Sequence, residues 1–402
     1  MLPFAFGYSL SYLLRAVNAV VAPDMMRELS LGPGTLGLLT ATYLLTFSSF
    51  QPVLGVLLDR FGPRRVQATL LAIAALGVLL FSFGSDLVTL GLARAVIGLG
   101  FSGGLMASFT AIVLWFPAPR IALANSLVMA FGGLGVVAAT RPADLLSQIV
   151  GWRALFWGLS AVTAISALYI FLSVPDRPAG PKAAPLRRQV AEIARILRDP
   201  FFWRLAPLVC STIGSYIAVQ TLWVGGWLRD VAGLSREAAA DLMMAMAVAF
   251  SAGMLAQGVI ADRLLRRGIG VMATVIGALA LYMACELALV LPGIAFADWL
   301  VYPIWIIYGM TGSVAVLTYP LLSEHFGKGL AGRSNTSMNL AMFGTAFAFQ
   351  SAIGWLVEAW PLAQPVGPAR FQPLGYQVVF TLMLAMQAAS VVWYWRSRGR
   401  SP

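Results

Sequence analysis

The residue types that catalyse reactions or bind metals are scarce in this chain. It has one histidine, His325, and two cysteines, Cys210 and Cys285, both in apolar runs without metal-ligand spacing. Isolated cysteines of this kind are typical of small buried hydrophobic positions. A single histidine cannot complete a metal site or a catalytic triad with its neighbours, and no phosphate-binding Walker motif occurs. We therefore expect no enzyme activity, no metal site and no cofactor.

Polar side chains instead recur at helical spacing inside an apolar segment near the amino terminus. Tyr8, Tyr12, Arg15 and Asn18 follow one another at steps of three and four residues within 4–22, which places them on one face of a helix. An arginine near the bilayer centre costs at least about 2.5–3.5 kcal/mol on the insertion scale. We expect Arg15 to face water or a partner and to bind an anionic group or act in gating. The alternative is a structural bond to helix carbonyls or to a tyrosine.

The elements that must hold these side chains follow from the composition. Of 402 residues, 59% are hydrophobic and 11% are charged, whereas about a quarter of a soluble globular chain is charged. This excludes a soluble enzyme or nucleic-acid-binding module. A membrane-spanning helix needs about 20 apolar residues. Segments of this length, each bounded by Pro, Gly or charge, occur at 4–22, 35–58, 66–84, 87–113, 121–141, 153–174, 205–227, 239–260, 271–291, 298–322, 334–357 and 376–395.

The positive charge predicts the orientation of these spans. The chain has a net charge of +11, and cytoplasmic loops of membrane proteins are rich in Lys and Arg. If the amino terminus is cytoplasmic, most of the 27 lysines and arginines fall in inner loops and the carboxyl tail. We therefore expect both termini in the cytoplasm and no nucleic-acid partner. The strong bias toward arginine over lysine is typical of a GC-rich bacterial genome, which indicates a multi-pass protein of a bacterial inner membrane.

The longest polar stretch divides six spans from six. We therefore expect an amino-terminal six-helix bundle at 1–174, a cytoplasmic linker at 175–203 and a carboxyl-terminal six-helix bundle at 204–402. Within the linker, Leu186 to Leu197 can form a basic amphipathic helix on the membrane surface. A plain tether between the bundles is the alternative, which we favour.

The two halves repeat a short motif at the cytoplasmic end of a span. Gly55-x-x-x-Asp59-Arg60 follows the second span, and Gly258-x-x-x-Asp262-Arg263 follows the eighth. Asp59 can accept hydrogen bonds from a helix amino terminus or pair with arginine. Such a charge cluster can hold the inner side closed in one conformation and release it in another. The alternative is an anchor that only fixes topology.

The first copy of this motif, with Gly62, Arg64 and Arg65, resembles the loop between spans two and three of the major facilitator superfamily. Arg94-Ala-Val-Ile-Gly98-Leu-Gly100 is similar to that superfamily's fourth-span motif. The resemblance implies twelve helices in two pseudo-symmetric six-helix bundles, with spans 1, 4, 7 and 10 lining a central cavity. It also ties Arg94 to proton coupling, although a structural hydrogen-bond hub is an equal alternative.

The resemblance turns polar residues of later spans into candidates for substrate contact. Beside the four residues of the first span, the candidates are Tyr216, Gln220, Trp223, Trp305, Tyr308, Asn335 and Asn339. Any single aromatic residue among them is more often packing than ligand contact. The candidates for gating are Gly55, Asp59, Arg60, Arg64, Asp262 and Arg263. Glu286, an isolated carboxylate in the ninth span, is a second candidate for proton coupling, although that span is expected to be peripheral.

Together these features predict a secondary active transporter that works by alternating access. An aromatic, hydrogen-bonding site with one fixed positive charge at Arg15 suits a small organic anion or metabolite, moved by proton-coupled symport. The alternative is a proton-driven efflux pump for drugs or metabolites. The sequence offers no group of acid, base, nucleophile or metal-ligand residues within the spans that would support a membrane enzyme or a sensor. The expected partners are a small-molecule substrate, protons and the lipid bilayer, and we expect a monomer.

Overall fold

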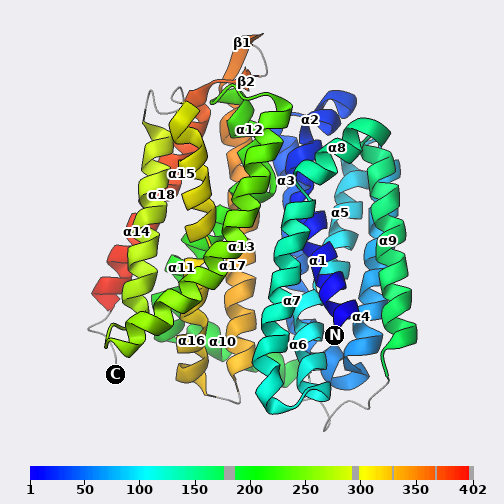
Figure 1. Cartoon of the computed structure of the whole chain (residues 1–402), viewed down its shortest axis with the longest axis vertical. Coiled ribbons are helices and arrows are strands. Elements are labelled where there is room, and N and C mark those ends of the chain that lie inside the picture. The colour runs from blue at the N-terminus through cyan, green and yellow to red at the C-terminus, as the bar shows by residue number, and fades with distance from the viewer. Residues whose placement is uncertain (176–185, 292–297, 328–329, 367–368, 398–402) are drawn as a thin grey trace. The chain divides into compact units, whose positions relative to one another are not determined.

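The chain is almost entirely helical. The structure, a computed structural model, describes residues 1–175, 186–291, 298–327, 330–366 and 369–397. Helices account for nearly all of them (Figure 1), which confirms the expected all-α fold. Residues 176–185 of the predicted linker lie outside the described residues. Lys328, in a predicted inner loop, also lies outside them.

The described chain forms two compact units. Unit 1 comprises Met1–Leu31 and Leu38–Ala191, and unit 2 comprises Gly32–Gly37 and Glu192–Pro402. The short segment Gly32–Gly37 thus packs with the carboxyl-terminal half although it precedes most of unit 1 in sequence. The exact bundle limits given above, 1–174 and 204–402, stay a prediction.

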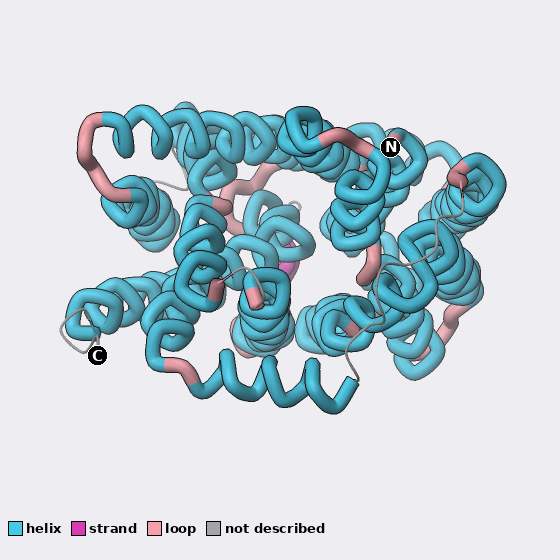
Figure 2. Tube along the Cα trace, turned by 90° about the horizontal axis from the view of Figure 1, so that it is seen from below, coloured by secondary structure: helices cyan, strands magenta, loops and turns pink. Residues whose placement is uncertain are grey.

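Among the described residues, unit 1 contains eight complete helices, most of α3 and the first part of α10. They are α1 (Leu2–Ala16), α2 (Asn18–Leu29), α3 (Pro33–Ser49), α4 (Gln51–Phe83), α5 (Leu87–Phe101), α6 (Gly104–Trp115), α7 (Ala118–Ala138), α8 (Arg141–Val150), α9 (Trp152–Ser173) and α10 (Leu186–Arg198). Helix α4 packs against α5 and α9, and α1 packs against α7. Figure 2 looks along many of the helices, which are drawn as tubes.

Unit 2 is built from the remaining helices and one small hairpin. Its elements are α11 (Pro200–Ala218), the π-helical turn η1 (Val219–Trp223), α12 (Val224–Asp230), α13 (Arg236–Arg266), α14 (Val271–Val290), α15 (Asp298–Thr311), the 3₁₀ turn η3 (Val314–Thr318), α16 (Tyr319–Phe326), α17 (Ala331–Glu358), β1 (Pro361–Val366), β2 (Ala369–Phe371) and α18 (Pro373–Arg396). The two strands pair antiparallel. Helix α11 packs against α17 and α18, and α13 packs against α15.

The predicted spans fall on these helices. Among the described residues, nine helical stretches are long and apolar enough to cross a membrane, and two bent pairs, α1 with α2 and α7 with α8, raise the number to eleven. The remaining predicted segment, 35–58, is divided between α3, which has 17 residues, and the first turns of α4. The structure therefore agrees with the twelve predicted segments.

The predicted loop between spans two and three is a kink at which two helical segments of α4 meet. Helix α4 runs from the end of span two through span three, and only Gly62 leaves helical geometry, with φ 75° and ψ 161°. Glycine adopts a positive φ without the strain that other residues suffer. Pro63, which has no amide hydrogen to donate, follows directly. The glycine–proline pair therefore turns the chain within one residue.

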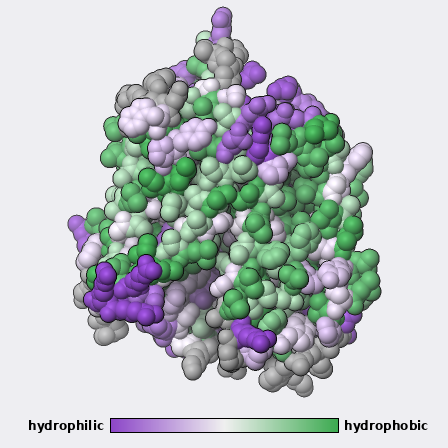
Figure 3. Space-filling view, viewed as in Figure 1, coloured by the Kyte–Doolittle hydropathy of each residue, from purple (hydrophilic) through white to green (hydrophobic). Residues whose placement is uncertain are grey.

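The surface is apolar along the helices. Large hydrophobic side chains that are more than half exposed include Leu76 on α4 and Leu172 on α9. Hydrophobic residues cover much of the face seen in Figure 3, whereas hydrophilic residues gather toward the helix ends. Exposed apolar patches of this extent mark a membrane surface or another interface. With the number of spans, they define a multi-pass membrane protein.

Candidate functional site

The first predicted span is broken beside its arginine. Helix α1 ends at Ala16 and α2 begins at Asn18, with a bend of 43° between them. Asn18 Nδ2 donates to the backbone oxygen of Arg15 at 3.3 Å. Arg15 and Asn18 therefore lie on either side of the break, where backbone groups of a helix are available for side-chain bonding.

Arg15 lies among aromatic rings. Its guanidinium carbon is 4.5 Å from the ring centroid of Tyr12 and 5.4 Å from that of Phe47, distances typical of cation–π contact. The side chain also bonds to the Tyr43 hydroxyl, which lies 3.3 Å from Ser11 Oγ. The residue is only 8% exposed. The structure thus surrounds a buried cation with π-faces and hydroxyl groups.

Two members of the predicted group on the first span, Tyr8 and Tyr12, contact each other. Tyr8 hydroxyl donates to Tyr12 hydroxyl at 3.2 Å, and their rings meet edge to face. Sequence reasoning did not single out Tyr43 and Phe47, which reach Arg15 from α3. The signal available was their own spacing of four residues, which places both rings on one face of that helix.

Arg94 occupies the interior of unit 1 and bonds to the same break. It is fully buried, with its guanidinium carbon 4.0 Å from the Phe81 centroid and 5.5 Å from that of Phe156. One terminal nitrogen donates to Asn18 Oδ1. Asn18 therefore bonds to Arg94 through its oxygen and to the Arg15 carbonyl through its nitrogen. This geometry favours the structural-hub interpretation of Arg94.

The aromatic candidates of unit 2 form one buried cluster. Tyr308 of α15 has its ring centroid 5.7 Å from Tyr216 of α11, 5.2 Å from Trp305 and 4.5 Å from Tyr282 of α14. Tyr216, Trp305 and Tyr308 are at most 1% exposed. In this conformation they pack against one another, and Tyr282 is a member that the sequence reasoning missed.

Gln220 and Trp223 lie on the π-helical turn that follows α11. Such turns are uncommon and occur frequently at functional sites. The indole nitrogen of Trp223 donates to the backbone oxygen of Gln350 on α17 at 3.0 Å, and the residue is buried. Gln220 is partly exposed. Its amide nitrogen, however, is buried.

The two asparagines of α17 bond to the segment that precedes it. Tyr319 hydroxyl donates to Asn339 Oδ1 at 2.7 Å, and Ser323 Oγ donates to Asn335 Oδ1 at 3.3 Å. Both asparagines remain partly exposed. Each amide nitrogen adds donor capacity beyond the bond accepted by its oxygen.

Glu286 lies deep inside unit 2. The residue is completely buried, with 0% exposure. Gln387 Nε2 of α18 donates to Glu286 Oε1 at 3.1 Å. Sequence reasoning missed Gln387, although a glutamine inside the apolar run 376–395 is itself a signal of an internal polar contact.

The gating candidates of the first motif flank the kink at Gly62 in α4. Asp59, Arg60 and Gly55 are exposed on α4. Arg64 Nε donates to the backbone oxygen of Phe171 on α9 at 2.9 Å, with its guanidinium 5.0 Å from that ring. Arg64 therefore ties the motif to the end of α9.

The second copy of the motif lies within a helix. Asp262 and Arg263 belong to α13, which continues to Arg266, and Asp262 pairs with Arg266 one turn later at 2.8 Å. The turn comes at Gly268, which has φ 80°. The second copy has Leu265 where the first has Gly62, and its helix extends past the motif.

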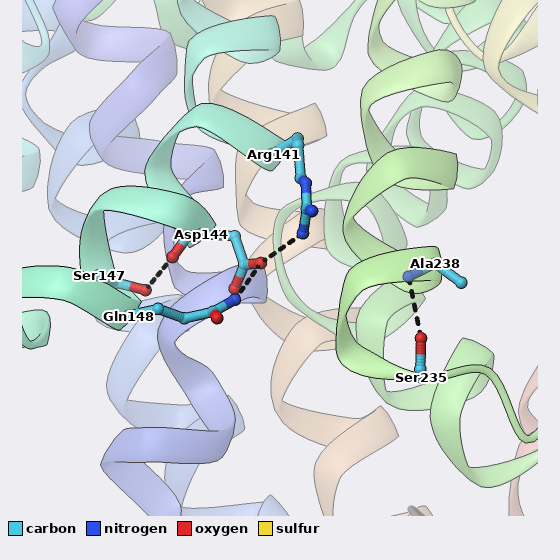
Figure 4. Close-up of polar contacts among 6 residues, drawn as sticks. All are labelled: Arg141, Asp144, Ser147, Gln148, Ser235 and Ala238. Carbon is cyan, nitrogen blue, oxygen red and sulfur yellow. Dashed lines mark hydrogen bonds and ion pairs between the residues drawn. The ribbon is translucent and has the colours of Figure 1, made fainter.

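Another buried carboxylate, Asp144 in unit 1, has a cationic partner. Figure 4 shows Asp144 Oδ2 accepting from Arg141 at 3.3 Å and from Gln148 at 2.8 Å on α8. The same figure shows the Ser235 hydroxyl accepting from the Ala238 amide at the start of α13, a typical helix cap.

Among the residues described, no group of three or more His, Cys, Asp or Glu is arranged to hold a metal ion.

The spans and the polar groups buried within them define a multi-pass membrane protein with polar sites at membrane depth. The family description "Major Facilitator Superfamily" matches residues 4–351. The chain belongs to the major facilitator superfamily, a family of transporters, as the motif around Asp59 predicted.

Individual relatives are distant. The chain is 25% identical over 277 residues to the "Probable sulfoacetate transporter SauU" of Cupriavidus necator, covering 65% of this chain and 64% of that protein. It is 25% identical over 271 residues to the "Inner membrane transport protein YdhP" of Escherichia coli, covering 66% of each. The chain thus spans somewhat less than two thirds of the first of these relatives.

The fold is similar to that of solved transporters. A bacterial homologue of the human lysosomal transporter Spinster, in an inward-facing and unoccupied conformation, matches with a TM-score of 0.76 at 17% identity, over 98% of this chain and 95% of that one. At this identity the likeness establishes the fold.

Proposed function

We propose that this protein is a secondary transporter that carries a small organic anion by alternating access, in symport with protons. The observation that carries the proposal is the position of Arg15 at the break between α1 and α2, buried among Tyr12, Phe47 and Tyr43. A cation kept in an apolar span is costly, and a site for an anionic substrate gives it a use.

The surroundings of Arg15 favour an organic anion over a bare inorganic one. A guanidinium is planar and donates two parallel hydrogen bonds to a carboxylate or a sulfonate. The Tyr12 ring and the hydroxyls of Tyr8 and Tyr43 offer π-faces and further donors for the rest of the molecule. The sulfoacetate named in the SauU description carries both a carboxylate and a sulfonate, so it is the first compound to test.

The other candidate residues take supporting roles in this proposal. Asn335 and Asn339, which keep partial exposure, would donate hydrogen bonds to the substrate, and Gln220 would do so once its buried amide nitrogen is uncovered. Tyr216, Trp223, Trp305 and Tyr308 would contact it only after a change of packing, because all four are buried.

The loop charges and the orientation complete the proposal. Asp59, Arg60, Arg64, Asp262 and Arg263 would make and break contacts at the inner ends of the helices as the transporter changes conformation. The protein would work as a monomer in a bacterial inner membrane, with both termini in the cytoplasm.

The test is ligand-induced thermal stabilisation of the purified protein. Sulfoacetate and other small carboxylates and sulfonates should raise the melting temperature of the wild type, and Arg15→Ala should abolish that rise. Arg15→Lys should retain part of it, because the charge remains without the bidentate geometry. Arg27→Ala is the matched control, since that side chain is 74% exposed at a helix end, and it should respond like the wild type.

Efflux of drugs or metabolites is the second candidate. The aromatic cluster around Tyr308 and the methionines Met243 and Met246 of α13 give unit 2 the adaptable apolar surfaces that promiscuous binders use. Stabilisation by lipophilic cations that survives Arg15→Ala would establish this candidate and refute anion symport.

A further inference from the structure

Four helices of unit 2 meet around one buried carboxyl group. Helix α14 packs against α15 and α18, and α11 packs against α18 (Figure 1). Gln387 Nε2 bridges the junction, donating to Glu286 Oε1 at 3.1 Å and to Ser215 Oγ at 3.3 Å. Tyr282 hydroxyl donates to Tyr308 hydroxyl at 2.7 Å. We call Glu286, Gln387, Ser215, Tyr282 and Tyr308 the carboxyl cluster.

The groups around Glu286 are neutral. The titratable groups described as interacting with it are Tyr282 and Cys285 on its own helix and Tyr308 on α15. The groups that complete the cluster from α11 and α18 are a hydroxyl and an amide, Ser215 and Gln387. This differs from Asp144, which has Arg141 as a partner.

A charged carboxylate is therefore disfavoured in the carboxyl cluster. Burying an ion without an opposite charge costs several kcal/mol even after the protein relaxes. Glu286 Oε2 has no hydrogen-bond partner within the described part of the chain. A proton bound to Glu286 Oε2 would make the carboxyl group neutral. The ligand that this site accepts is thus the smallest cation available, a proton.

The carboxyl cluster is continuous with the aromatic residues proposed for substrate contact. The Tyr282 and Tyr308 rings stack with centroids 4.5 Å apart, and Tyr308 lies 5.7 Å from Tyr216 between ring centroids. Tyr282 hydroxyl also lies 3.4 Å from Ser215 Oγ. A change in the charge of Glu286 therefore reaches Tyr308 and Tyr216 through direct contacts, without a long pathway.

We propose that Glu286 is the site that binds and releases the coupling proton, and that Gln387 is the residue that positions its carboxyl group. This inference rests on the proposed proton symport. On loading, a proton from water forms an O–H bond at the Glu286 carboxylate and leaves a neutral acid. On release, that bond breaks, the proton returns to water and the carboxylate remains. Arg94, bonded to Asn18, keeps a structural role.

Infrared difference spectroscopy of the purified wild-type protein tests the site without any substrate. A pH step should change the carbonyl stretch of a protonated carboxyl group, and Glu286→Gln should remove that change. Gln387→Leu should move the band to a different frequency, because the bond to Oε1 is lost. Asp144→Asn is the matched control, since that buried carboxyl group pairs with Arg141 and lies in unit 1, outside the carboxyl cluster, and it should leave the band in place. A wild-type band that persists in Glu286→Gln overturns the proposal.

Transport in proteoliposomes tests coupling. With sulfoacetate as the probe, a pH gradient should drive accumulation by the wild type, and Glu286→Gln should lose at least tenfold of that accumulation while keeping exchange between equal concentrations on both sides. Accumulation by Glu286→Gln at the wild-type level overturns the proposal. If the wild type moves neither sulfoacetate nor other small organic anions, the proposed function is wrong and coupling falls with it. The infrared band distinguishes that failure from an error about Glu286.

Discussion

Asn18 is the residue that links Arg15 and Arg94. Its amide oxygen accepts from Arg94 and its amide nitrogen donates to the Arg15 carbonyl. An asparagine can do both because it carries a donor and an acceptor on one flat group. The break in the first span is therefore held by a side chain at the place where the helix loses its own backbone bonds.

Removing the Asn18 amide should destabilise unit 1. In Asn18→Ala, the buried Arg94 guanidinium loses its acceptor, which should lower the free energy of unfolding by about 1–3 kcal/mol. Asn18→Asp keeps an oxygen at the same place and adds a negative charge beside Arg94, so it should be at least as stable as the wild type. Thermal unfolding in detergent measures both. Equal melting temperatures for the two variants would show that the bond to Arg94 contributes nothing.

Asp86 provides a pH-dependent contribution outside the spans. Its carboxylate accepts from the Thr89 amide at 3.0 Å, the Thr89 hydroxyl at 2.8 Å and the Val88 amide at 2.9 Å, capping α5. These hydrogen bonds, led by that from the Thr89 amide, lower the pKa of Asp86. A carboxyl whose pKa is lower in the folded state contributes stability that is present above its unfolded pKa, about 3.9, and is lost as the pH falls through the folded value.

The melting temperature of Asp86→Ala should therefore approach that of the wild type at acid pH. The wild type should melt at the higher temperature at about pH 6, and the difference should shrink as the pH is lowered below about 3.9. Thr381→Ala, which alters an exposed hydroxyl on α18, serves as the control with a difference that does not vary with pH. A gap between wild type and Asp86→Ala that stays constant over this range would contradict the assigned role.

At the level of elements, the sequence predicted the spans better than their interruptions. A bilayer requires about 20 apolar residues per helix, so hydropathy locates each span. The break at Val17 and the π-helical turn at Val219–Trp223 cannot be located from hydropathy, because they arise from side-chain bonds and packing. The helical spacing of Tyr8, Tyr12, Arg15 and Asn18 could be recognised from the sequence alone. Tyr43 and Gln387 could not be paired with Arg15 and Glu286, because the rotation of one helix against another is set by tertiary contacts.

Close helix contacts at glycine give a second prediction about elements. A side chain at Gly98 on α5 would overlap the Tyr43 carbonyl oxygen and the Thr46 hydroxyl of α3, whereas a Cβ at Gly91 on the same helix meets nothing within 4 Å. Gly98→Ala should lower the free energy of unfolding by about 1–3 kcal/mol through overpacking. Gly91→Ala should raise it by up to about 1 kcal/mol through helix propensity. Thermal unfolding of the pair decides, and a Gly98→Ala protein as stable as Gly91→Ala would show that α3 and α5 separate at little cost.

For the whole molecule, the charges lie where a bilayer would require them. Exposed arginines lie beside the kink of α4, as Arg60 does, or at a helix end, as Arg266 does on α13, and the sides of the helices expose leucine and tryptophan. The arginines inside the spans, Arg15 and Arg94, are instead buried against aromatic rings. Position in the fold thus separates the exposed arginines from those that are buried against aromatic rings.

The predicted orientation can be tested by labelling single cysteines in intact cells. In a background where Cys210 and Cys285 are replaced by serine, Ser85→Cys lies between spans three and four, and Arg267→Cys lies after span eight; both positions are exposed. With the termini in the cytoplasm, a membrane-impermeant maleimide should label Ser85→Cys in intact cells and Arg267→Cys only after lysis. The cysteine-free parent gives the background signal. Labelling of Arg267→Cys in intact cells, with protection of Ser85→Cys, would invert the topology and place Asp59 and Asp262 on the outer side, where they could not act at an inner gate.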